Sequence, residues 1–181
     1  MKTKVGQRQL NLAIISAIVL GIVGLSTNTC ADTTADMAVT ANINPSCTLS
    51  TTDLDFGAYD AVVANATEDL TASAQISTTC TSGATGVVTM NQGDHAFYCV
   101  NFNCIRRMAN AEETSFLRYQ IYTNAGYSVV WNHDVDEMSS VASVIGTGVS
   151  QNLTVFGEVP KNQRYATAGS YSDLVSITLT Y

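Results

Sequence analysis

The sequence is poor in the residues on which catalysis and nucleic-acid binding usually depend. Its 181 residues include two histidines, one tryptophan and two prolines, and eight lysines and arginines are outnumbered by fifteen acidic residues. It contains no Gly-x-Ser-x-Gly elbow, no His-Glu-x-x-His motif and no Gly-rich phosphate loop. We therefore expect no enzyme, no cofactor and no small-molecule substrate, and the excess of acidic residues argues against a nucleic-acid partner.

One group of residues has the composition of a hydrolytic or metal site. His133 is followed by Asp134, Asp136 and Glu137, and the only other histidine is His95. The acidic residues lack the spacing of an EF-hand calcium loop, and the sequence has neither a Cys-x-x-Cys spacing nor a nearby histidine pair. We interpret the group as a solvated turn and expect no bound metal.

Residues 1–31 have the pattern of a secretory signal peptide. Basic residues precede an apolar run at 10–25, and Thr29-Cys30-Ala31 offers small residues for cleavage near Ala31. A membrane anchor would need about 20 apolar residues, and lipidation of Cys30 would need an apolar pattern ahead of it, so we discount both. We expect export through the periplasm.

Removal of residues 1–31 leaves 150 residues, a length that suits one domain with a substantial core. The leader contains three of the eight basic residues and none of the fifteen acidic ones, so the remaining chain has a formal charge of −10. Such acidity fits a protein that stays soluble outside the cytoplasm.

Four cysteines follow the leader, at positions 47, 80, 99 and 104. An even count in an exported chain predicts two disulfides, which allow three pairings. We favour Cys47–Cys80 and Cys99–Cys104, because the second pair closes a short local loop and the first pair lies on two segments predicted to be strands.

Alternating apolar and polar residues predict an all-β fold. Between Leu70 and Cys80, for example, the even positions from 70 to 76 are apolar and the odd ones polar, so one face of this strand lies in a core. The other predicted strands are Cys47–Thr51, Val87–Asn91, Phe116–Thr123, Ser128–Trp131, Gln151–Val159 and Ser172–Tyr181. Seven short strands separated by turns indicate a β-sandwich.

The last predicted strand has one apolar face. The face consists of Tyr171, Val175, Ile177, Leu179 and Tyr181. Because this strand ends the sequence, we expect its free edge to need a partner strand.

Residues 32–45 also alternate. The apolar positions are Ala35, Met37, Val39, Ala41 and Ile43, and Pro45 interrupts the pattern. Two interpretations stay open at this point: an additional strand ahead of the domain, or an ordinary first strand of the same sandwich. Periodicity does not decide which sheet the strand joins.

Several fragments together resemble the spore coat protein U domain of subunits in archaic, Csu-type chaperone-usher pili. The resemblance covers nearly the whole chain after the leader, and its most specific part is the ending, Ala168–Asp173 followed by the alternating strand. The fragments are Val39–Ile43, Cys47–Ser50, Leu54–Asp60, Ile76–Cys80, Arg106–Met108, Leu117–Thr123, Val130–Trp131, Leu153–Gly157 and Ala168–Asp173.

The resemblance implies an incomplete immunoglobulin-like β-sandwich that lacks its final strand. A periplasmic chaperone, and then the extension of another subunit at an outer-membrane usher, would supply that strand. Residues 32–45 would be the donor extension and 46–181 the pilin domain, with the alternating side chains of each as donor and groove. The expected function is a structural subunit that polymerises by donor-strand exchange into a surface fibre and supports adhesion and biofilm formation.

Residues 93–104 depart from the family pattern. We interpret them as a connection stapled by the second disulfide; as an alternative, Phe97, Tyr98 and Phe102 would contact a surface or a neighbouring subunit. A minor or tip adhesive subunit and a self-contained secreted coat protein are the alternative functions.

Overall fold

The computed structural model describes residues 30–100, 103–132 and 141–181. Residues up to Ala41 and residues 42–181 form two separate units, and the strands of the described residues all lie in the second. Residues 1–29 of the predicted signal peptide, Phe102 and the acidic group at 133–137 lie outside the described residues. In the described part of the chain, no helix has the length and apolar character needed to cross a membrane.

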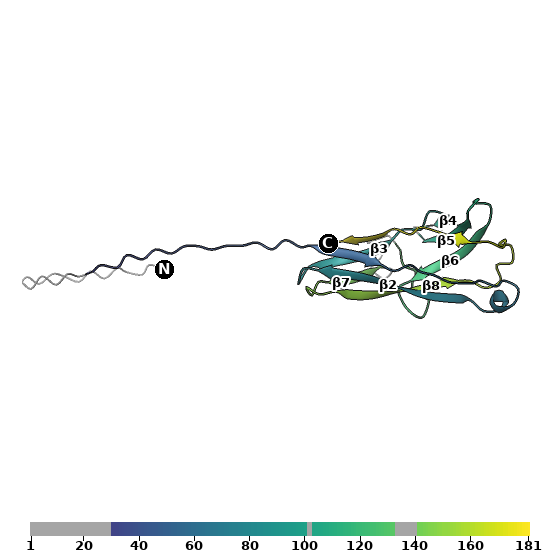
Figure 1. Cartoon of the computed structure of the whole chain (residues 1–181), viewed down its shortest axis with the longest axis horizontal. Helices are drawn as coiled ribbons and strands as arrows, with labels where there is room; N and C mark the ends of the chain where they lie inside the picture. Colours follow the sequence, from purple (N-terminus) through teal and green to yellow (C-terminus); the bar gives the residue numbers. More distant parts are fainter. Residues whose placement is uncertain (1–29, 101–102, 133–140) are drawn as a thin grey trace, which may run out of the picture. The chain divides into compact units, whose positions relative to one another are not determined.

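Seven strands pair antiparallel in the larger of two sheets (Figure 1). In order across the sheet they are β1 (Cys47–Thr51), β2 (Leu70–Cys80), β8 (Gln151–Val159), β6 (Phe116–Tyr122), β5 (Asn103–Asn110) and β4 (Phe97–Val100), and β9 (Tyr171–Ser172) pairs with β5. The longest pairing joins β2 to β8, from Leu70 opposite Val159 to Thr78 opposite Gln151. The longest pairing of the sheet therefore joins two strands that the alternation predicts.

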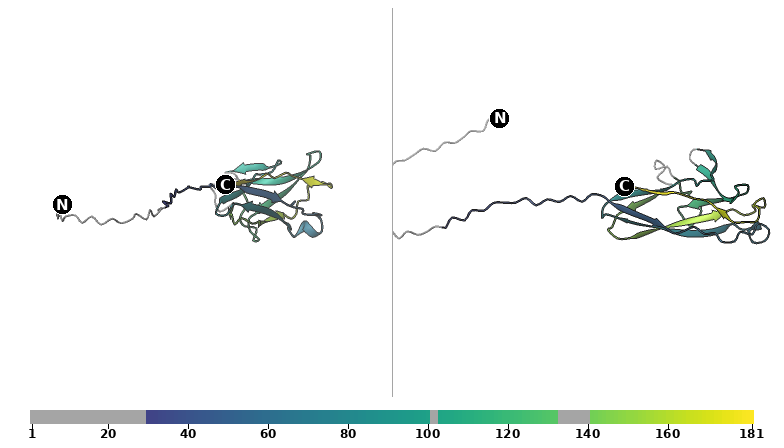
Figure 2. Two further views of the ribbon diagram at one scale, coloured as in Figure 1. Left: turned by 60° about the vertical axis from the view of Figure 1, so that its left-hand side comes forward. Right: turned by 45° about the horizontal axis from the view of Figure 1, so that its top comes forward.

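The smaller sheet has the order β10 (Ile177–Thr180), β3 (Thr85–Met90) and β7 (Ala142–Ile145). Figure 2 shows, from two further sides, that the axes of these antiparallel strands are broadly aligned. The only helical element among the described residues is a 3-10 turn at Ala64–Ala66. The predicted all-β class is confirmed.

One core joins the two sheets. It contains Ile76 and Val155 from the larger sheet and Val88 from the smaller. Trp131, which is 1% exposed, lies between them: its backbone N–H donates to Ile121 O of β6, and its indole Nε1 donates to Val88 O of β3 at 3.0 Å. Each fully buried aliphatic side chain of this kind contributes about 1.5–3 kcal/mol.

Both expected disulfides are present. Cys47 and Cys80 lie opposite each other at the ends of β1 and β2, and Cys99 and Cys104 close the hairpin of β4 and β5. The first disulfide ties the edge strand β1 to its neighbour β2. The second links the two strands of a hairpin, in a segment for which we predicted only a stapled connection.

The structure corrects the strand prediction in three places. The predicted strand Ser172–Tyr181 is two strands in different sheets, because residues 173–176 cross from one sheet to the other. Ser128–Trp131 forms only a single bridge, between Val130 and Tyr122. Strands β4, β5 and β7 were not predicted; in β5 the buried Arg106 hides the alternation, because an inward position there is polar.

Candidate functional site

The edge strand β10 has an unsatisfied side. It pairs with β3, and no other strand of the described residues lies on its second edge. Its side chains alternate, with Ile177 and Leu179 half-buried against the core and Thr178 and Thr180 exposed. An edge with free N–H and C=O groups and an apolar inner face is a template for a further strand.

Three of the predicted groove residues lie at this edge: Ile177 and Leu179 on β10, and Tyr181 just after it. Tyr171 instead lies in β9 of the larger sheet and Val175 in the crossover, so the five do not share the single strand that we predicted. Tyr171, Val175, Ile177 and Leu179 all pack against the core as partly buried side chains, while Tyr181 is 57% exposed. None of the five reaches the burial of Val88 on the neighbouring strand, which is fully buried. The core therefore has apolar surface in contact with solvent along the C-terminal segment.

A second stretch of partly buried apolar residues follows β1. Leu54 and Phe56 pack against the backbone of Gly157 in β8, so closely that a Cβ on this glycine would lie 2.7 Å from Leu54 and 2.8 Å from Phe56. The Phe56 ring also meets Tyr119 edge to face, with centroids 6.2 Å apart. This stretch covers the inner face of β8, which β10 does not reach.

An open depression of about 690 Å³ lies between residues 54–61 and residues 166–171. Met108, Leu117 and Val159 of the larger sheet also line it. The depression borders Tyr171, so the apolar surface around β10 continues at the start of the C-terminal segment.

Asp173 fixes the crossover between β9 and β10. Its side chain is only 2% exposed. The backbone N–H groups of Asp94 and His95 donate to Oδ1 at 2.9 and 3.2 Å, His95 Nδ1 lies 2.9 Å from the same oxygen, and the Tyr119 hydroxyl donates to Oδ2 at 2.6 Å. Burial, and then the hydrogen bond to Asp173, raise the pKa of Tyr119 well above its ordinary value. Tyr119 is therefore a neutral donor at physiological pH.

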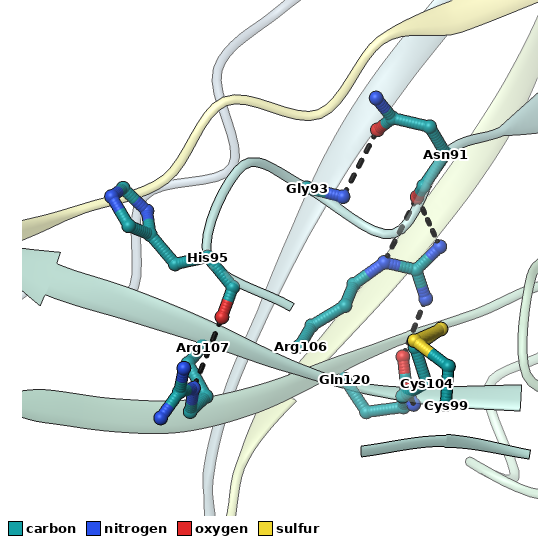
Figure 3. Close-up of a disulfide and its surroundings, with 8 residues drawn as sticks. All are labelled: Asn91, Gly93, His95, Cys99, Cys104, Arg106, Arg107 and Gln120. Atoms are coloured by element: carbon teal, nitrogen blue, oxygen red, sulfur yellow. Dashed lines mark hydrogen bonds between the residues drawn. A yellow bond between two sulfur atoms is a disulfide. The ribbon is translucent and has the colours of Figure 1, made fainter. Parts of the chain in front are cut away.

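Arg106 anchors the same region from β5 (Figure 3). It is 2% exposed, and its guanidinium donates to Asn91 O, to Trp131 O at 2.8 Å and to the side chain of Gln120. Burial lowers the pKa of Arg106 below its ordinary value, and the nearby Tyr119 and Asp173 offset this lowering only in part.

Asn91 in turn holds the start of β10. Its side-chain Oδ1 accepts hydrogen bonds from the backbone N–H of Ser176 at 2.9 Å and of Gly93 at 3.0 Å, and its own N–H donates to Ser176 O. Polar contacts thus fix where β10 begins, while its second edge has no partner strand among the described residues.

The predicted donor residues belong to a segment without strands. Residues 30–46 have no assigned secondary structure. Ala35 and Ala41 are exposed, and Met37, Val39 and Ile43 are 86%, 88% and 80% exposed. Exposure of large apolar side chains to water is unfavourable, so the segment has apolar surface that a partner could bury.

No described residues assemble a metal site. In the described ranges, no three His, Cys, Asp or Glu side chains are grouped so that they could hold an ion. His95, the described histidine of the two that we considered, instead contacts Asp173. The group from His133 to Glu137 lies outside the described residues.

Sequence reasoning missed the polar anchors of the C-terminal segment. Asn91 belongs to no motif, and Arg106 and Asp173 were noted only as members of fragments that resemble the family. The available signal was an aspartate at an odd position of an otherwise apolar face, between Tyr171 and Val175, since a charge on a core face needs partners.

Comparisons with known proteins agree with one another. The family model for the Spore Coat Protein U domain matches residues 33–178. Protein U of Myxococcus xanthus is 31% identical over 167 residues, which cover 88% of this chain and 91% of that protein.

A solved structure has the same fold. It is a chain in the CsuC–CsuE chaperone–tip adhesion subunit pre-assembly complex from archaic chaperone-usher Csu pili of Acinetobacter baumannii, with a TM-score of 0.50 and 22% identity over 77% of this chain. This chain spans 40% of the length of that solved chain. The fold is the expected incomplete immunoglobulin-like sandwich, and the match of the family model over residues 33–178 establishes that the chain belongs to the spore coat protein U domain family.

Proposed function

We propose that the chain is a structural subunit of a chaperone-usher pilus that polymerises by donor-strand exchange. One observation carries the proposal: β10 has a free edge whose alternate side chains Ile177 and Leu179 are half-buried. Residues 32–45 of another copy offer the matching pattern, with exposed Met37, Val39 and Ile43 at alternate positions. Both segments have the period of two that strand pairing requires.

The energetics favour this pairing. Each large donor side chain that becomes buried contributes about 1.5–3 kcal/mol, and the free N–H and C=O groups of β10 gain partners. These gains offset the entropy lost when two copies associate and the extension becomes ordered. Because the extension and the groove are different surfaces, the contact is head-to-tail and produces an open filament.

The proposal assigns residues 1–31 to a signal peptide, 32–45 to the donor extension and 46–181 to the pilin domain. A periplasmic chaperone would cover β10 before assembly, and an outer-membrane usher would exchange the chaperone for the next extension. The mature fibre would lie on the cell surface and serve adhesion and biofilm formation. The likeness to a chain of a chaperone–subunit complex supports the chaperone as a partner.

A change of one donor side chain tests the proposal. Val39→Asp places a carboxylate in the groove of the next subunit, so cells that express this variant with its chaperone and usher are expected to export the subunit without forming fibres. The control Thr40→Asp puts the same charge on the opposite face of the same strand and is expected to leave fibres visible by electron microscopy. Equal fibre formation by both variants would contradict the donor assignment.

A self-contained coat protein is the second candidate. The nearly full-length match to Protein U of Myxococcus xanthus favours it. This candidate requires a stable monomer that needs no strand from another copy, whereas a subunit that polymerises gains stability when β10 is paired.

A further inference from the structure

The positive charges of the chain are concentrated. After residue 31 the sequence has five arginines and lysines, and all of them lie between residues 106 and 164. Arg106 is buried in the network described above. Three of the other four line one surface depression of about 690 Å³. We call it the cationic depression; its charged and aromatic residues are Arg107, Arg118, Lys161, Phe97, Phe116 and Tyr165.

Arg107 is held rigidly at this site. Its guanidinium carbon lies 4.7 Å from the centroid of the Phe97 ring and 4.0 Å from that of Phe116, and its Nε donates to His95 O at 3.0 Å (Figure 3). Cation–π stacking and one backbone acceptor thus fix the plane of the guanidinium. Among the described residues its two terminal nitrogens have no hydrogen-bond partner, and they are available to a ligand.

Arg118 and Lys161 present free charges beside it. Both side chains are exposed, and neither lies within 4.0 Å of a carboxylate in the described part of the chain. Their backbones are nevertheless fixed, because Lys161 N–H donates to Asp69 at 2.8 Å and the side chain of Gln163 bonds both the N–H and the C=O of Arg118. Cations without a carboxylate partner, on a backbone that hydrogen bonds hold in place, are available to bind an anion.

The hydrogen bonds of Gln163 also exclude one class of ligand. Since its side chain occupies the backbone groups of Arg118, an acidic peptide cannot add to that strand by main-chain pairing. A ligand here meets side chains: three cations and the rings of Phe97 and Tyr165, which are 47% and 99% exposed.

The charge of the whole protein limits the ligand further. After residue 31 the chain has five basic and fifteen acidic residues, a formal charge of −10, so a densely charged polyanion is repelled by most of the surface. A polymer with one carboxylate per sugar suffers less repulsion, and its ring faces are free to pack on aromatic side chains. We propose that the cationic depression binds an acidic polysaccharide of the polyuronate class. The inference does not rest on polymerisation, because every residue in the site belongs to one copy.

The test measures binding of polygalacturonate, with neutral dextran and dextran sulfate as comparisons, to the exported full chain by isothermal titration calorimetry. Polygalacturonate is expected to bind, dextran not to bind, and dextran sulfate to bind more weakly than polygalacturonate. The interaction should weaken when NaCl is raised from about 50 mM to about 300 mM.

Variants locate the site. Lys161→Gln is expected to weaken binding about threefold, and Arg118→Gln with Lys161→Gln about tenfold or more. Arg164→Gln is the matched control, because Arg164 is an exposed cation of the same loop that does not line the depression; its effect should stay below about twofold. Tyr165→Ala tests the aromatic contribution and should weaken binding without changing thermal unfolding, because this side chain is 99% exposed.

Three results would overturn the proposal. The first is no binding of polygalacturonate, or equal binding of dextran. The second is an equal loss for Arg164→Gln and Lys161→Gln, which would indicate a diffuse charge effect. The third is that dextran sulfate binds more tightly than polygalacturonate, which would assign the depression to a different anion, or that Lys161→Gln affects only the association between copies, which would assign it to a second copy.

Discussion

The hydroxyl of Tyr119 in β6 donates a hydrogen bond of 2.6 Å to Oδ2 of Asp173, which lies between β9 and β10. Tyr119 is 5% exposed and the Asp173 side chain 2%, so the bond is shielded from water. It joins the middle of the larger sheet to the segment that becomes the edge of the smaller one. The position of the proposed acceptor strand therefore depends on a buried carboxylate.

Asp173→Ala is expected to destabilise the chain by about 3 kcal/mol, because the buried Tyr119 hydroxyl and the backbone N–H groups of Asp94 and His95 would all lose their acceptor. Tyr119→Phe removes one donor and should cost only about 1 kcal/mol. Urea unfolding measures both, and Asp53→Ala, at an exposed carboxylate, should stay within about 0.5 kcal/mol of the unchanged chain. Similar costs for Asp173→Ala and Asp53→Ala would refute the anchoring role.

Tyr119 also predicts a dependence of stability on alkaline pH. Its pKa in the folded chain is raised above the ordinary value of 10.0, first by burial and then by Asp173. The contribution of this group is therefore fully present below pH 10, and is lost as the pH rises beyond it, because the unfolded chain releases the proton first. The melting temperature of the unchanged chain should fall more steeply above pH 10 than that of Tyr119→Phe. Parallel curves would contradict the predicted protonation state.

The two disulfides should differ in their contribution to stability. Cys47 and Cys80 are 33 residues apart, and Cys99 and Cys104 only 5. Because a disulfide restricts the unfolded chain more when its loop is longer, replacing the first pair by alanine should cost about 4 kcal/mol and replacing the second about 2 kcal/mol. Denaturant unfolding of the two double variants gives the comparison. The reverse order would mean that the β4–β5 hairpin depends on its disulfide more than chain entropy explains.

Much of the fold follows from short-range patterns. Strands β1, β2 and β8 have the predicted bounds, since apolar and polar residues alternate over most of each strand. Both disulfides were also predicted, because strand assignment and loop length together favour one pairing of three.

The remainder depends on tertiary contacts that leave no periodic signal. Strand β5 contains the buried Arg106, whose burial is possible only because Asn91, Gln120 and Trp131 from distant parts of the chain provide acceptors. The crossover of the C-terminal segment between sheets depends on Asp173 in the same way. The cationic depression brings together three separate segments of the chain, so its charges look scattered in the sequence.

Strand β10 pairs with β3 on one edge only, and one comparison of thermal unfolding tests whether its second edge needs a partner strand. The chain from residue 32 onward is compared with a variant that lacks residues 32–44 and with one in which these residues are moved to follow Tyr181. A second version of the moved segment, with Val39→Asp, is the control for the donor side chains. Size-exclusion chromatography reports the oligomeric state of each.

If donor-strand exchange occurs, we expect the chain from residue 32 to form fibres or aggregates and the variant without residues 32–44 not to polymerise. The variant with the moved segment should be a monomer whose melting temperature is higher by at least about 10 °C, and the version with Val39→Asp should lose most of this gain. If the chain from residue 32 is already a stable monomer and moving the segment leaves its melting temperature unchanged, the second edge of β10 needs no partner strand and donor-strand exchange is refuted.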